Sequence, residues 1–78
     1  MRIMLADDHA LFRAGLRALL SDLQGAEIVA EACDGVEATR QALQLRPDLA
    51  FLDIAMPGLN GLGALAQIKA AAPDIRVI

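Results

Sequence analysis

Short, continuous apolar runs alternate along the chain with stretches in which apolar residues recur every three or four positions. The continuous runs are typical of strands that are covered on both faces of a sheet. The three-to-four spacing is typical of amphipathic helices. We therefore predict strands at 3–6, 27–32, 49–52 and 75–78. We predict helices at 10–23, 36–46 and 61–72.

Two of the predicted helices have a clear apolar face. On the first helix this face holds Phe12, Leu16, Leu19, Leu20 and Leu23. On the third helix, for which Asn60 is the predicted N-cap, it holds Gly61, Leu65, Ile68 and Ala72. Gly15 costs the first helix about 1 kcal/mol relative to alanine, and close packing at this position would explain it.

The order of these elements, β-α-β-α-β-α-β, indicates the class of fold. Strands that alternate with helices form a parallel sheet with helices on both faces, and each crossover is expected to be right-handed. We predict an α/β fold with a doubly wound parallel sheet of the flavodoxin-like type, in the strand order 2-1-3-4. At 78 residues the chain makes one domain at most.

Composition narrows the class of protein. Apolar residues make up 56% of the chain and charged residues 22%, which argues against a disordered tail. The net charge of -3 and the scattered basic residues argue against a nucleic-acid surface in this segment, because phosphate backbones need clustered Lys and Arg. No stretch is long and apolar enough to span a membrane. We expect a cytoplasmic protein without membrane contact.

Acidic side chains follow two of the predicted strands. Asp7 and Asp8 come directly after the first strand, and Asp53 comes directly after the third. These strands are neighbours in the predicted order, and ligands of doubly wound sheets bind outside the carboxyl ends of strands. One such aspartate alone would more often be simply solvated, but three at the ends of adjacent strands favour a shared site.

Three carboxylates in one pocket need compensation for their charge. Two unit charges about 4 Å apart interact by about 4 kcal/mol at an effective dielectric constant of 20. The cluster must take up a proton, spread into water or hold a cation, and oxygen ligands select a hard cation such as Mg²⁺. An Asp carboxylate can also attack phosphorus. The pattern therefore predicts a phosphoacceptor carboxylate assisted by Mg²⁺.

Two segments carry a resemblance to a known family. Segment 7–16 is similar to that of NarL/FixJ-type (LuxR-family) transcription regulators, and segment 53–61 matches the phosphorylation-site signature of response regulators. The whole chain resembles the receiver domain of bacterial two-component systems, with its CheY-like fold. The resemblance implies that Asp53 accepts a phosphoryl group from a sensor histidine kinase, in a signalling domain that is not an enzyme.

The resemblance also implies a magnesium site and further partners. Asp8 matches a direct ligand of Mg²⁺, Asp7 an acid that acts through a bound water, and the backbone carbonyl of Ala55 a further ligand. Receivers carry a Ser or Thr after strand four and a Lys after strand five, and the chain ends before both. We expect residues 1–78 to be the N-terminal part of a receiver, truncated after its fourth strand, with DNA contacted only through an absent C-terminal helix-turn-helix domain.

The remaining expectations concern self-association and rival functions. The apolar edge at 75–78 predicts self-association by edge pairing or strand exchange. A haloacid-dehalogenase-like phosphatase wants an Asp where this chain has Ala55, and a nucleotide-binding domain wants a glycine-rich loop that is missing after the first strand. A receiver fragment that serves only as an oligomerisation module stays open as the alternative.

We interpret His9 as a solvent-facing residue at a helix start, and Cys33 as a small packed residue.

Overall fold

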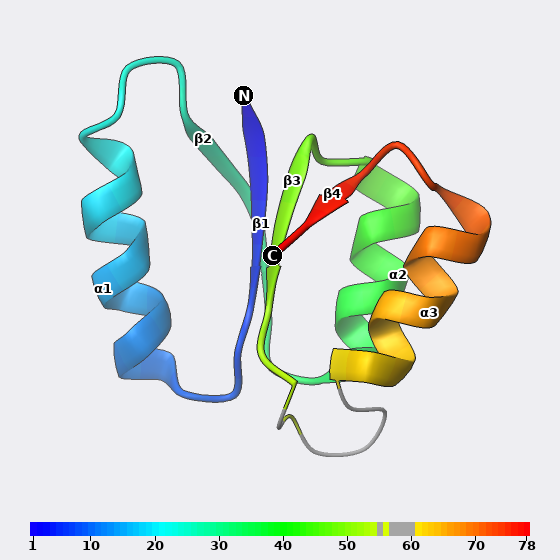
Figure 1. The fold of residues 1–78 in the computed structure, drawn as a ribbon. Coiled ribbons are helices and arrows are strands. Elements are labelled where there is room, and N and C mark those ends of the chain that lie inside the picture. The colour runs from blue at the N-terminus through cyan, green and yellow to red at the C-terminus, as the bar shows by residue number, and fades with distance from the viewer. Residues whose placement is uncertain (55, 57–60) are drawn as a thin grey trace.

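A computed structural model describes residues 1–54, 56 and 61–78 of the chain. Four strands alternate with three helices in the predicted order (Figure 1). The strands are β1 (Arg2–Ala6), β2 (Glu27–Ala32), β3 (Leu49–Leu52) and β4 (Arg76–Val77). The helices are α1 (Ala10–Ser21), α2 (Gly35–Leu45) and α3 (Gly61–Ala71). The boundaries of β2 and β3 are those predicted from the apolar runs.

The strands form one parallel sheet in the order β2-β1-β3-β4, which confirms the predicted doubly wound fold. β1 lies at the centre, and its residues Ile3 to Ala6 are buried, as expected for a strand covered on both faces. The backbone N–H of Asp53 donates to the carbonyl of Ala6 at 2.9 Å. The N–H of Asp7 donates to the carbonyl of Ala32 at 3.0 Å. These bonds align the carboxyl ends of β1, β2 and β3.

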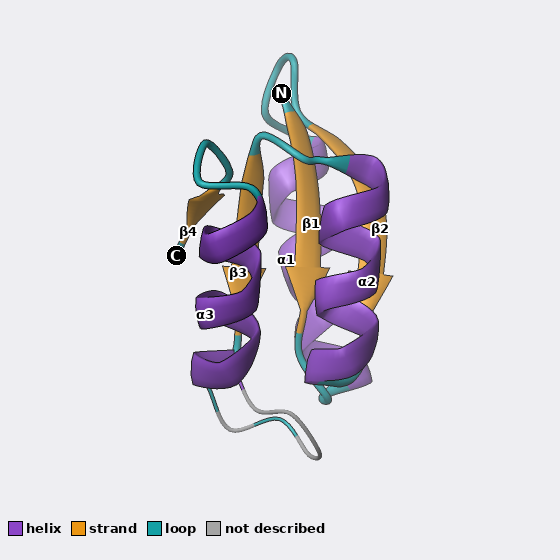
Figure 2. Cartoon of the chain, turned by 90° about the vertical axis from the view of Figure 1, so that its right-hand side faces the viewer, coloured by secondary structure: helices purple, strands orange, loops and turns teal. Residues whose placement is uncertain are grey.

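The helices cover the two faces of the sheet unequally. α2 and α3 lie side by side on one face, and α1 lies alone on the other (Figure 2). The hydrophobic core fills the space between the sheet and the helix pair. Its members are Met4, Ala6, Ala32, Ala38, Ala42, Ala50, Met56, Ala64, Ile68, Ala72 and Ile75. Of the face predicted for α3, Gly61, Ile68 and Ala72 are buried and Leu65 is half-buried, with Ala64 added to the buried set.

Helix α1 has the predicted apolar face, but the sheet covers that face only in part. None of its residues is buried. Phe12 is 55% exposed, Leu19 is 69% exposed and Leu23 beyond its end is also exposed, while Leu16 and Leu20 are half-buried. A Cβ added at Gly15 would meet nothing within 4 Å, so close packing does not explain this glycine. The periodicity predicted the helix, and its apolar face is only partly covered because no second helix packs beside α1 among the described residues.

Helix α2 is capped at both of its ends. The Asp34 side chain accepts a hydrogen bond from the backbone N–H of Glu37 at 2.8 Å, which caps the N-terminus. Arg46 ends the helix in a left-handed conformation, with φ of 47°. Cys33, just before this cap, is exposed, so the prediction of a packed residue was wrong. The predicted N-cap of α3, Asn60, lies outside the described residues.

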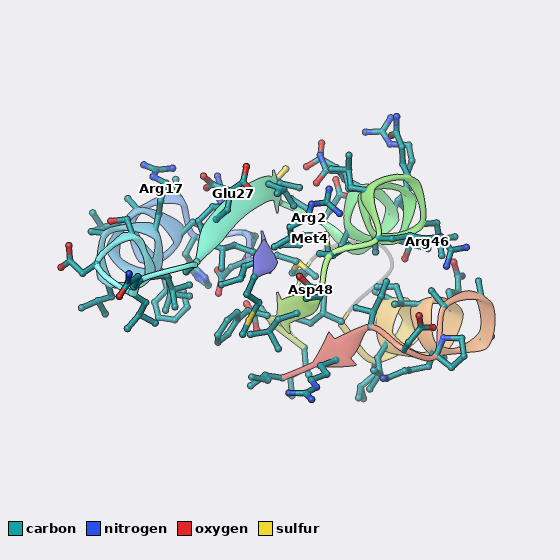
Figure 3. The ribbon with its side chains drawn as sticks, turned by 90° about the horizontal axis from the view of Figure 1, so that it is seen from above. Arg2, Met4, Arg17, Glu27, Arg46 and Asp48 are labelled. Atoms are coloured by element: carbon teal, nitrogen blue, oxygen red, sulfur yellow. The ribbon has the colours of Figure 1, made fainter. Side chains whose placement is uncertain are left out.

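The amino ends of the strands lie at one edge of the sheet, and Asp7, Asp8 and Asp53 lie at the opposite edge. The backbone N–H of Arg2 donates to Asp48 Oδ2 at 2.8 Å, and its side chain donates to the carbonyl of Leu45 at 2.6 Å. Figure 3, seen from above, shows Arg2 between β1 and α2, with Asp48 nearby. These contacts tie the start of β1 to the end of α2 and the start of β3.

Candidate functional site

The three aspartates predicted to converge lie together at the carboxyl ends of β1 and β3. One side-chain ligand atom from each of Asp7, Asp8, His9 and Asp53 lies within 4.8 Å of the others. The cause is the parallel pairing of β1 with β3, in which Ala6 is opposite Leu52 and the next residues leave the sheet at the same edge. Asp7 and Asp53, 46 positions apart in sequence, thus share one site.

Asp7 is the most buried member of this carboxylate cluster. Its Oδ1 accepts a hydrogen bond from the backbone N–H of His9 at 2.7 Å, which turns the chain sharply toward α1. Asp8 is exposed and Asp53 is half-buried. The cluster therefore has a buried acid at its base and open access from solvent through Asp8.

His9 lies closer to the cluster than the sequence predicted. Its side chain is 69% exposed, as expected, yet Nδ1 lies 2.7 Å from Asp7 Oδ1, 3.1 Å from Asp8 Oδ1 and 4.0 Å from Asp53 Oδ2. The hydrogen bond with Asp7 and the negative charges of Asp8 and Asp7 raise the pKa of His9 above 6.5. The imidazole thus lies where a cation would compensate the carboxylates. Its position directly after Asp7 and Asp8 was the signal for this role in the sequence.

Gly61 brings α3 against the backbone that carries Asp53. A Cβ at this position would lie 2.5 Å from the Cα of Ile54 and closer still to the carbonyl oxygen of Asp53. Only a residue without a side chain permits this approach. The start of α3 therefore packs directly against the backbone that follows β3.

A comparison with protein families decides the class of this chain. The model of the response regulator receiver domain matches residues 3–78. The chain belongs to the receiver domain family.

Individual relatives support the assignment to the receiver domain family. The receiver is 37% identical over 78 residues to the response regulator GacA of Pseudomonas viridiflava, covering 100% of this chain and 36% of that protein. A solved two-component response regulator of the LuxR family from Aurantimonas sp. SI85-9A1 is 38% identical with a TM-score of 0.92, over 97% of this chain and 54% of that one. A chain of the CheX–CheY–BeF3–Mg²⁺ complex from Borrelia burgdorferi is 26% identical with a TM-score of 0.93, over 99% and 58%.

These matches establish a CheY-like receiver fold. Receiver domains of response regulators are signalling modules. The receiver spans about a third of the length of the curated relatives that it matches. Within the part of the chain that the structure describes, no helix has the length and apolarity to cross a membrane.

The donor set of the receiver fits a hard divalent cation. Three carboxylates offer oxygen ligands, and Mg²⁺ is held in proteins by one or two carboxylates together with waters. Asp8, which is exposed, can bind a cation while the remaining positions stay open to water and to a phosphoryl group. The predicted carbonyl ligand, Ala55, lies outside the described residues.

Sequence reasoning missed Arg13, which joins the site to α1 and β2. Its Nη1 donates to the backbone carbonyl of Asp7, and its Nε donates to Glu31 Oε1 at 3.2 Å. Glu31 also accepts from Arg17 Nη1 at 2.5 Å. The hydrogen bond from Arg17, followed by the charges of both arginines, lowers the pKa of Glu31 below 4.5 against the effect of burial. No pattern of period or spacing marks such a contact.

Proposed function

We propose that this receiver accepts a phosphoryl group on Asp53 from a sensor histidine kinase, with Mg²⁺ held directly by Asp8 and through a water by Asp7. The observation that carries the proposal is the convergence of these three carboxylates at one sheet edge. The relative solved with BeF3 and Mg²⁺ supports it. The backbone carbonyl of Ala55 completes the proposed ligand set.

The transfer needs a carboxylate oxygen, a leaving group and compensation of charge. An Asp53 oxygen attacks the phosphorus of a phosphohistidine, the new O–P bond forms, and the P–N bond breaks with its electrons returning to the imidazole of the kinase. Bound Mg²⁺ would neutralise charge that develops on the phosphoryl oxygens. Asp7 is held at the base of the cluster by the backbone N–H of His9, and this bond keeps its carboxylate oriented.

We further propose that the chain is the first part of a receiver in a NarL/FixJ-type transcription regulator of the cytoplasm. The similarity to a LuxR-family regulator and to GacA supports this subtype. DNA would be contacted by a C-terminal helix-turn-helix domain, and the receiver itself would perform no catalysis on a separate substrate. These roles belong to the whole protein, since the curated relatives are about three times as long as residues 1–78.

The test is phosphorylation with a small phosphodonor. The chain is incubated with acetyl phosphate and Mg²⁺, and its intact mass is measured. We expect a gain of one phosphoryl group that is absent in Asp53→Asn and without Mg²⁺. Asp74→Asn, a change at an exposed aspartate far from the cluster, is the matched control and should behave as wild type. A gain that persists in Asp53→Asn, or no gain in any protein, would contradict the proposal.

A second function, association through the sheet edge, is favoured by β4. In the described sheet β4 lies at the edge, where Ile78 donates to the carbonyl of Ala50 at 2.9 Å and stays 68% exposed. Such an edge can pair with another chain. We propose that the receiver self-associates there, and that without phosphorylation it would act as an oligomerisation module. Light scattering should show dimers that Val77→Lys dissolves; a monomer at high concentration would refute this.

A further inference from the structure

The guanidinium of Arg13 contacts the turn that carries two of the proposed site residues. Its Nη1 donates to the backbone carbonyl oxygen of Asp7, and its Nε donates to Glu31 on β2 at 3.2 Å. The Arg13 side chain is only 18% exposed. One side chain of α1 thus connects the end of β1 with the neighbouring strand, at the edge where the carboxylates lie.

The bond to the Asp7 carbonyl acts on both aspartates at once. The carbonyl of Asp7 and the N–H of Asp8 belong to one peptide plane, which is rigid. The other side of Asp7 is already held, since its N–H donates to Ala32. Fixing the carbonyl therefore fixes the direction in which the chain leaves β1, and with it the Cα of Asp8.

We propose that Arg13 is a positioning residue for the metal site of this receiver: it holds the peptide between Asp7 and Asp8 so that both carboxylates face Asp53. The proposal rests on the proposed function, in which this site binds Mg²⁺. Glu31 holds Arg13 in place by accepting its Nε–H, and the planar guanidinium is needed because a single ammonium cannot span both acceptors in fixed geometry.

Arg17 provides a matched control on the same helix. It lies one turn further along α1 and pairs with the same Glu31, at 2.5 Å through Nη1. Within the described part of the chain, Arg17 pairs with Glu31 and makes no hydrogen bond to Asp7. Arg13→Gln and Arg17→Gln each remove one positive charge and one contact to Glu31, and they differ in the bond to Asp7.

The experiment measures the Mg²⁺ affinity of wild type, Arg13→Gln, Arg13→Lys and Arg17→Gln. Calorimetry or amide NMR is suitable, because the chain has no Trp or Tyr for intrinsic fluorescence. Loss of residues that orient metal ligands typically weakens binding about tenfold or more. We expect about that loss in Arg13→Gln and in Arg13→Lys, and a change of about twofold or less in Arg17→Gln.

The sign of the change separates positioning from simple charge. Removing a cation near a cation site would by Coulomb's law tighten Mg²⁺ binding, whereas loss of positioning weakens it. Unchanged or tighter binding in Arg13→Gln, equal losses in Arg13→Gln and Arg17→Gln, or wild-type affinity in Arg13→Lys would each overturn the proposal.

Two readouts keep the result independent of folding and of the proposed function. Thermal unfolding of each variant by circular dichroism shows whether the protein is folded at the temperature of the titration. If Arg13→Gln is not folded there, Arg13→Lys is used in its place. Amide shifts at Asp8 should move in the Arg13 variants and not in Arg17→Gln. Mg²⁺ binding that is equal in all proteins would reject the role of Arg13 alone, while a wild type that binds no Mg²⁺ would reject the metal site itself.

Discussion

Helices α2 and α3 cover one face of the sheet and helix α1 covers the other, and the two sides differ in what holds them. On the first side Ala38, Ala42, Ala64 and Ile68 are fully buried. On the second side no residue of α1 is buried, and Leu11 is 87% exposed. Small side chains on α2 and α3 allow close approach, whereas the large apolar side chains of α1 are half-buried at Leu16 and Leu20 and exposed at Leu11, Phe12 and Leu19.

The α1 side is instead held by polar contacts near the carboxylate cluster. Arg13 and Arg17 both reach Glu31, and Arg13 also reaches Asp7. A separate groove of about 400 Å³ lies between α1 and the sheet, lined by Phe12 and Leu16 of α1, by Asp7 and Asp53, and by apolar residues that include Leu5 and Phe51. The comparison teaches that close packing dominates the side under α2 and α3, while the α1 side, where Leu5 of β1 is also buried, is distinguished by directional hydrogen bonds near the site.

The largest expected effect tests the burial side of this comparison. Ile68→Ala removes a fully buried side chain from α3 and should lower the free energy of unfolding by about 2–5 kcal/mol. Leu19→Ala on α1 should change it by about 0.5 kcal/mol or less, because Leu19 is exposed. Urea unfolding followed by circular dichroism measures both, and Ile68→Val, at about 0.5–1.5 kcal/mol, serves if Ile68→Ala does not fold. Equal losses from the two helices would break the comparison.

A pair of glycines sharpens the same contrast. Gly61→Ala places a Cβ against the backbone of Ile54 and Asp53 and should destabilise the protein by about 1–3 kcal/mol. Gly15→Ala adds a methyl group in open space within α1 and should stabilise it by about 0.5–1 kcal/mol. Thermal unfolding of both variants gives opposite signs if α3 is closely packed and α1 is not. A loss of stability in Gly15→Ala would show that neighbouring atoms fill the space around Gly15, which would contradict the open packing of α1.

The smallest expected effect tests the polar side through pH. The pKa of Glu31 is lowered in the folded state, so its pairing stabilises the fold above pH 4.5 and is lost as pH falls through the folded pKa. Wild type should therefore lose stability on acidification below pH 4.5 relative to Glu31→Gln, which lacks this dependence. Urea unfolding across the acid range measures the difference, with Glu27→Gln at the exposed start of β2 as control. Parallel curves for wild type and Glu31→Gln would count against the pairing.

The order and type of every element, and the convergence of Asp7, Asp8 and Asp53, followed from the sequence. Continuous apolar runs and period-3.6 patterns record which backbone geometry buries apolar residues, and the runs predicted the strands at 27–32 and 49–52 to the residue. The short connections then made the sheet parallel, and a parallel sheet brings the carboxyl ends of its strands to one edge.

The exposure of the apolar face of α1, the exposure of Cys33 and the contact of Arg13 were decided by tertiary structure alone. Periodicity says that a face is apolar, and only the neighbouring elements decide whether that face is covered. A hydrogen bond from Arg13 to the carbonyl of Asp7 depends on where a whole helix lies relative to a strand end. Such contacts join groups by distance in space, and the sequence pattern carries no record of that distance.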